Sequence, residues 1–193
     1  MKTGDIKRIK ILNGWGEEFP IDARYLGRGA FATCYEADGF VYSFVKANDA
    51  HNHTDYSKEA LSEWASGLNV PEFEKMGIME DGRALYKSPL YNPLTPKNKV
   101  AWNQFRILES AWKKTSYKKF GYEFNYTLID SVRDVLPIEL IESLESINSA
   151  CSNYGDSYYF EFPRRNLKID SNGNLILLDV IFNSHATKGY LTS

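Results

Sequence analysis

The chain has too few cysteines to be built on covalent cross-links. Among its 193 residues only Cys34 and Cys151 are cysteine, which excludes a disulfide framework and a cysteine metal cluster. The first residues, Met1 to Asp5, lack the apolar region of a signal peptide. No apolar run approaches the roughly 20 residues of a membrane span. We therefore expect a reduced, cytoplasmic protein that does not bind membranes.

An excess of one charge is also missing. The net charge is −2, which argues against a nucleic-acid binder held by bulk electrostatics. Residues 113–126 interleave lysines with aromatic rings, a pattern that can stack single strands. Without a basic excess, a solvated loop with buried rings is the favoured interpretation. Hydrophobic residues make up 43% of the chain and charged residues 25%, so the composition predicts a packed core.

The most informative stretch lies near the C-terminus. Glu161 stands in a predicted loop, Asn166 follows five residues later, and Ser171-Asn172-Gly173 predicts a hairpin turn. Residues 175–178 form an apolar run typical of a buried strand, and Asp179 follows it directly. A carboxylate in that position lies at the mouth of a core, where it can hold a cation that a phosphate chain also contacts. An acid, an Asn and an acid in this order favour Mg²⁺-assisted phosphoryl transfer.

A glycine turn joins two predicted strands in the N-terminal part. Gly27 and Gly29 flank one residue, so backbone N–H groups there can approach a phosphate without a Cβ in the way. Phe31 can cover the loop tip. Lys46 ends the third strand of this region and can place a point charge on phosphate oxygens. The alternative is an ordinary hairpin turn with Lys46 as a solvated strand residue.

Hydrophobic periodicity predicts an α+β protein with strands first and helices after them. Up to about residue 90, beside an edge strand over 1–20, we count five strands and one helix. The predicted elements are an edge strand and loop over 1–20, strands at 22–26, 32–37, 40–47, 76–80 and 84–87, and helices at 54–68, 98–112, 127–136 and 138–148. Pro93, Pro96 and Asn98 mark a linker. The pattern therefore predicts two units, 1–92 and 93–193.

Two acids in the predicted helix 54–68 are candidates to hold Lys46. Glu59 and Glu63 are one helical turn apart, so either one can face the lysine. We favour Glu59. The alternative is that both acids belong to a solvated helix face.

The motifs together resemble the protein-kinase-like superfamily. Residues 26–35 resemble the Gly-rich loop with an aromatic at its tip, although Ala32 stands where many kinases have a third glycine. Residues 41–46 resemble the strand that carries the phosphate-binding lysine. The segment from Glu161 to Asn166 has the spacing of the catalytic loop, and Asp179 occupies the place of the metal-binding Asp.

This resemblance implies a two-lobed fold with ATP and Mg²⁺ bound between the lobes. The implied N-lobe, residues 1–92, is a five-stranded antiparallel sheet with one helix, and the implied C-lobe, residues 93–193, is reduced and mostly helical. The implied roles are phosphate binding by Gly27 and Gly29 under Phe31, pairing of Lys46 with the α/β-phosphates, positioning of Lys46 by Glu59 or Glu63, Glu161 as base, and Asn166 with Asp179 as Mg²⁺ ligands.

Within the superfamily, residues 22–188 resemble the early serine/threonine protein kinases of T-odd coliphages. The resemblance rests on the glycine turn, the acid-loop-Asn segment and the Ser-Asn-Gly hairpin. It implies phosphorylation of host proteins during infection, in the bacterial cytoplasm, linked to shutoff of host transcription.

Several positions depart from the kinase pattern. Glu161 is one methylene longer than the usual Asp, which changes the reach of a base toward a substrate hydroxyl. Pro163 replaces a common lysine, whose charge Arg164 or Arg165 could supply. Residues 180–193 are too few for an activation segment and docking helices. These departures favour a second hypothesis, a pseudokinase that binds and inhibits a host protein. A third is a small-molecule kinase of the aminoglycoside type.

Overall fold

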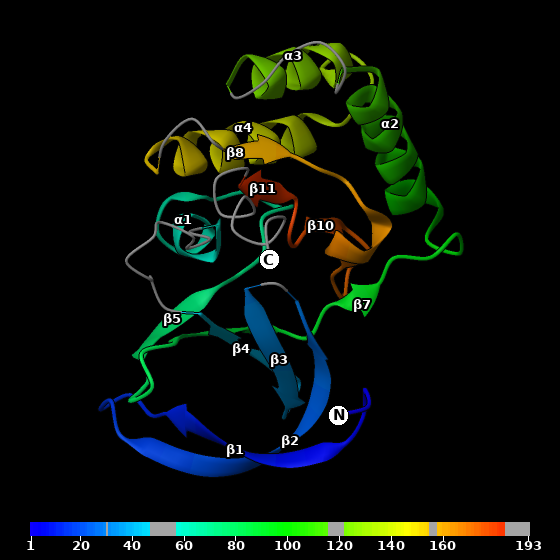
Figure 1. Ribbon diagram of the computed structural model, residues 1–193. Helices are drawn as coiled ribbons and strands as arrows, with labels where there is room; N and C mark the ends of the chain where they lie inside the picture. Colours follow the sequence, from blue (N-terminus) through cyan, green and yellow to red (C-terminus); the bar gives the residue numbers. More distant parts are fainter. Residues whose placement is uncertain (30, 47–56, 116–121, 155–157, 184–193) are drawn as a thin grey trace, which may run out of the picture.

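The computed structural model describes residues 1–29, 31–46, 57–115, 122–154 and 158–183. Its architecture is α+β, as predicted: a curled antiparallel sheet forms one end of the molecule and helices form the other (Figure 1). The sheet has the strand order β1-β2-β3-β4-β6-β5. Its strands are β1 (Ile6–Leu12), β2 (Glu18–Arg28), β3 (Ala32–Ala37), β4 (Phe40–Val45), β5 (Glu74–Ile78) and β6 (Ala84–Pro89).

The sheet contains six strands, so the predicted count of five is wrong. Strand β2 is 11 residues long, enough to pair with two neighbours in succession. Its first part pairs with β1, from Glu18 opposite Leu12 to Arg24 opposite Ile6, and its last part pairs with β3. The predicted edge strand is therefore a full member of the same sheet.

The predicted hairpin turns are confirmed where glycine supplies the backbone freedom. Asp38 and Gly39 both have positive φ angles, 53° and 79°, as a two-residue turn between β3 and β4 requires. Gly82 has φ 82° in the turn between β5 and β6. These turns are local, and the sequence alone is enough to place them.

Alternation along β4 gives the sheet two different faces. Tyr42 and Phe44 are buried in a cluster with Ile9, Ile11, Tyr35, Met79 and Leu85 on the face inside the curl. Val41 and Ser43 point to the other face, toward the helices, and line a cleft described below.

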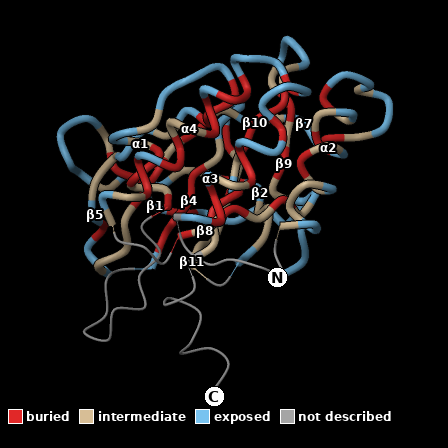
Figure 2. Tube along the Cα trace, turned by 90° about the horizontal axis from the view of Figure 1, so that it is seen from above, coloured by how far each residue is buried: buried red, intermediate tan, exposed pale blue. Residues whose placement is uncertain are grey.

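Four helices occur in the described residues: α1 (Ser57–Trp64), α2 (Lys99–Thr115), α3 (Tyr122–Val132) and α4 (Ile138–Ser152). They share a second core with the short C-terminal strands. Figure 2 shows the buried residues of both cores in red, toward the inside of the trace. Ala60 and Leu61 of α1 belong to this core, so α1 packs with the other helices. Of the predicted helix 54–68, residues 54–56 lie outside the described residues and residues 65–68 are not helical. No described helix is long and apolar enough to cross a membrane.

The C-terminal part adds two small sheets. Strands β7 (Asn92–Pro93), β9 (Leu167–Ile169) and β10 (Leu175–Leu177) form one, in the order β10-β9-β7. Strands β8 (Tyr158–Phe160) and β11 (Ile181–Asn183) form the other. A short 3₁₀ turn, Arg164–Asn166, lies between β8 and β9. The predicted linker therefore enters directly into pairing with the C-terminal segment, because β7 pairs with β9.

Candidate functional site

Three residues selected from the sequence lie together in the fold. The side-chain amide of Asn166 donates from Nδ2 to the carbonyl oxygen of Asp179 at 2.5 Å and to Oε1 of Glu161 at 3.4 Å. The backbone N–H of Asp179 donates in return to the carbonyl oxygen of Asn166 at 3.2 Å. Both side-chain bonds use Nδ2, so Oδ1 of Asn166 takes no part in them.

The local sequence explains why the acids stand at the surface of a core. Phe160 and Phe162 are fully buried on either side of Glu161, which is half-buried. Val180 is buried directly after Asp179, which is exposed. The N–H of Glu161 donates to the carbonyl oxygen of Val180 at 2.8 Å, which holds the two acidic segments side by side. Alternating buried and open positions thus fix each acid at the end of a packed segment.

Two buried asparagines hold the strands that carry these acids. The side chain of Asn69 donates from Nδ2 to the carbonyl oxygen of Leu175 at 2.6 Å. The backbone carbonyl oxygen of Asn69 accepts a hydrogen bond from the N–H of Leu177 at 2.9 Å. Asn125 accepts the N–H of Phe160 at 2.9 Å. Both asparagines are almost fully buried. The sequence analysis missed them, because a lone Asn carries no pattern that shows it is buried.

The donor set fits a magnesium ion that arrives with a phosphate ligand. Among the described residues there is no group of three or more His, Cys, Asp or Glu side chains able to hold a metal. Mg²⁺ typically uses one or two carboxylates together with substrate phosphates and water, and it prefers oxygen ligands. Oδ1 of Asn166 and the carboxylate of Asp179 are ligands of that kind. These residues alone do not provide a complete set of protein ligands for a metal ion.

A cleft lies between the sheet and the C-terminal part. Its volume is about 520 Å³, within the range of about 300–1,000 Å³ that is usual for small-molecule sites. Leu26, Val41 and Leu178 contribute apolar walls, and the segment 88–93 closes one side. Leu178, a lining residue, directly precedes Asp179 in the chain, whereas Glu161, Asn166 and Asp179 are not themselves among the lining residues.

The glycine turn borders this cleft. Gly27 pairs with Cys34 across β2 and β3, and both Leu26 and Cys34 line the cleft. A Cβ added at Gly27 would meet no atom within 4 Å, so the space beside it is open. The N–H of Gly29 donates to the carbonyl oxygen of Ala32 at 2.8 Å. Phe31 is half-buried and does not line the cleft, and residue 30 lies outside the described residues.

The structure does not bring Lys46 to the cleft. Val41 and Ser43 line the cleft, whereas Phe44 faces the opposite core. The N–H of Lys46 continues the strand pairing with a 2.8 Å bond to the carbonyl oxygen of Phe31. Lys46 follows the last residue of β4, is exposed, and is not among the residues that line the cleft. Its position does not support the predicted contact with nucleotide phosphates.

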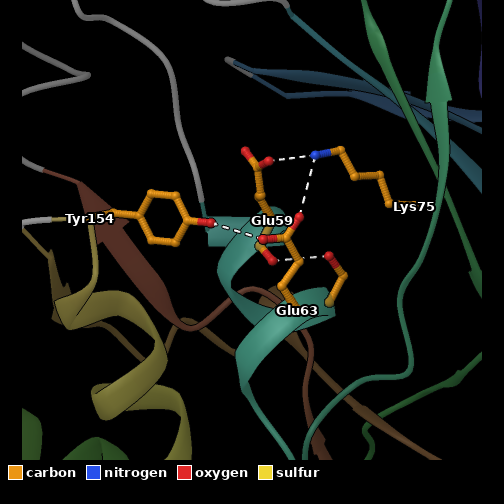
Figure 3. Close-up of polar contacts among 5 residues, drawn as sticks. Glu59, Glu63, Lys75 and Tyr154 are labelled. Atoms are coloured by element: carbon orange, nitrogen blue, oxygen red, sulfur yellow. Dashed lines mark hydrogen bonds and ion pairs between the residues drawn. The ribbon is translucent and has the colours of Figure 1, made fainter.

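The expected partner of Lys46 is engaged elsewhere. Glu59 of α1 forms an ion pair with Lys75 of β5, and Glu63 lies 3.5 Å from the same Nζ (Figure 3). The hydroxyl of Tyr154 donates to Glu63 at 3.4 Å. The hydrogen bond to Glu59 raises the pKa of Lys75 above its usual value. The predicted pairing of Glu59 with Lys46 is therefore corrected to Glu59 with Lys75.

Cations that the sequence analysis missed do line the cleft. They are Arg24, Lys58 and Lys168, and no acid is found among the described residues that line it. Arg24 is bound to Glu36 at 2.8 Å. Burial lowers the pKa of Lys168, which is the behaviour of a partly desolvated ammonium group. In the sequence, only its position two residues after Asn166 could have indicated that Lys168 lies near the site.

Comparisons of the chain with protein-family models, with curated proteins and with solved structures found no match.

Proposed function

We propose that the cleft binds ATP with Mg²⁺ and that the protein is a phosphotransferase of the serine/threonine protein kinase type. One observation carries the proposal: Glu161, Asn166 and Asp179, an acid, an Asn and an acid, meet directly after Leu178, which lines a ligand-sized cleft. Phosphoryl transfer needs such oxygen ligands for Mg²⁺ beside a nucleotide and an acid near the attacking hydroxyl.

Each group has a role in this proposal. Asp179 and Oδ1 of Asn166 would hold Mg²⁺, which supplies charge neutralisation on the phosphates when bound. Glu161 would accept the proton of the acceptor hydroxyl, a task that requires hydrogen-bond distance to that hydroxyl. The base of the nucleotide would pack against Leu26 and Val41 from the sheet.

The arrangement of strands supports the finer proposal of a two-lobed, protein-kinase-like fold. Strands β2, β3, β4, β6 and β5 follow one another in an antiparallel sheet, and α1 lies between β4 and β5 in the chain. The additional strand β1 lies outside that set, at the edge of the sheet. The acceptor in this proposal is a protein of a phage-infected bacterium, which rests on the sequence resemblance alone.

A phosphotransfer assay tests the proposal. Purified protein incubated with γ-labelled ATP and Mg²⁺ should label itself or a protein of a bacterial lysate. Asp179→Asn should abolish the labelling, because the change removes a charged Mg²⁺ ligand and keeps the shape of the side chain. Asp134→Asn is a matched control at an exposed position in the turn after α3. Labelling that persists in Asp179→Asn would refute the proposed mechanism.

The alternative of a pseudokinase, which binds its target without transferring phosphate, has one observation in its favour. Lys46 lies outside the cleft and Glu59 is bound to Lys75, so the lysine–glutamate pair implied by the resemblance is missing from this structure. A thermal melt with Mg²⁺-ATP distinguishes the cases, since a ligand that binds only the folded state raises the midpoint. An unchanged midpoint together with no phosphate transfer favours the pseudokinase.

A further inference from the structure

Lys58 is one of the three cations among the described residues that line the cleft, with Arg24 and Lys168. Lys58 is the second residue of α1 and lines the cleft. Its Nζ lies 4.5 Å from the ring centroid of Phe73, another lining residue, so a cation–π contact helps to hold the ammonium group there. Arg24, by contrast, already has Glu36 as its partner.

The acids next to Lys58 on α1 form ion pairs with another lysine. Glu59 and Glu63, on the same helix, are both bound to Lys75 from β5 (Figure 3). No described carboxylate forms an ion pair with Lys58. Lys75 therefore pairs with both acids of α1, and Lys58 lines a cleft whose described lining residues include no acid.

Lys58 also lies on the side of the cleft toward which the phosphates of a nucleotide would point. Helix α1 packs against β11, the strand that begins two residues after Asp179. The apolar wall of Leu26 and Val41 belongs to β2 and β4. A nucleotide with its base on that wall and its phosphates near Asp179 would therefore direct its phosphates toward α1.

We propose that Lys58, in place of Lys46, is the lysine that binds the phosphates of the nucleotide in this cleft. The proposal rests on the proposed function of the cleft as an ATP site. An ammonium group needs no fixed backbone position to bind phosphate, since it acts as a point charge on a flexible stem. A lysine on a helix can therefore bind the phosphates in place of a lysine on a strand.

Titration calorimetry with two ligands tests this assignment in the full chain. The ligands are ATP with Mg²⁺, and adenosine, which has no phosphate. Lys58→Gln should weaken ATP binding by about tenfold to hundredfold, the usual effect of losing one charge-assisted hydrogen bond. Its affinity for adenosine should stay within about twofold, because the base contacts are intact. Lys58→Arg should recover a large part of the ATP affinity.

Two comparison variants make the test decisive. Lys46→Gln should change the affinity for ATP by less than about threefold, and Lys99→Gln, an exposed lysine on α2, gives the effect of removing any surface charge. The inference is overturned if Lys46→Gln weakens ATP binding more than Lys58→Gln, or if Lys58→Gln weakens ATP and adenosine equally. Wild-type protein that binds neither ligand overturns the proposed function itself.

Discussion

Double-mutant cycles on the ion pairs of α1 test how this helix is held against the sheet. The cycle compares Lys75→Gln, Glu59→Gln and the double variant by urea unfolding. Side chains of Lys75 and Glu59 are 32% and 25% exposed, so solvent partly screens the pair. We expect a coupling energy of about 0.5–1 kcal/mol at pH 7, near the upper end for such pairs. The cycle with Glu63, which is 39% exposed and 3.5 Å away, should give less, about 0.2–0.5 kcal/mol.

The pH dependence of the coupling has a definite sign. The pKa of Lys75 is raised from its ordinary 10.5, first by the hydrogen bond to Glu59. A raised lysine pKa means that the stabilisation is fully present below pH 10.5 and is lost as the pH rises through the higher folded value. The coupling measured at pH 7 should therefore persist at pH 9 and decline above pH 10.5. High salt should reduce it, because screening weakens partly exposed pairs.

The same measurement on Lys46 and Glu59 provides the refuting outcome. Glu59 forms its ion pair with Lys75, so its coupling to Lys46 should be indistinguishable from zero. A coupling for Lys46–Glu59 that exceeds the one for Lys75–Glu59 would contradict the charge arrangement on which the role of Lys58 depends.

Three further predictions concern the segments that carry the site. Asn69→Ala leaves the buried carbonyl of Leu175 without its donor, and should cost about 1–3 kcal/mol in urea unfolding; no loss would contradict its anchoring role. Asp170→Ala should cost about 1 kcal/mol at pH 7, because the carboxylate accepts N–H groups of the following turn. Burial opposes these bonds, yet they lower the pKa of Asp170 below 3.8, so the cost should be retained at pH 5 and should disappear as the pH falls through that lowered value. Lys168→Met should raise the melting temperature by about 2–4 °C, the shift for about 1 kcal/mol, since it removes a half-buried cation; a lower melting temperature would show that the charge has a partner.

Local patterns in the sequence were sufficient for most of the elements. Alternation and turn residues placed β3 at its observed bounds, and helical periodicity located α2 and α4 to within a few residues. The cluster of Glu161, Asn166 and Asp179 was also foreseeable. Its members stand at the ends of packed segments that are close in the sequence, and only a hairpin separates the second from the third.

Contacts between elements that are far apart in the sequence could not be predicted. Lys75 lies 16 residues beyond Glu59, and nothing in the spacing shows that β5 passes beside α1. The error for Lys46 has a different cause. The strand was recognised, but it ends at Val45, and Lys46 is exposed and does not line the cleft. The place of Lys58 in the cleft depends on how α1 packs, which the sequence of the helix does not show.

The most direct test of the account is calorimetric titration of the full chain with ATP and Mg²⁺, repeated on Val41→Trp. Val41 is half-buried on the cleft face of β4, so a larger ring there fills the site, while circular dichroism checks that the fold is retained. The account predicts saturable binding of one ATP that weakens at least about tenfold in folded Val41→Trp, a loss of about 1.4 kcal/mol. Unchanged binding in that variant, or no binding by the wild-type chain, would contradict it.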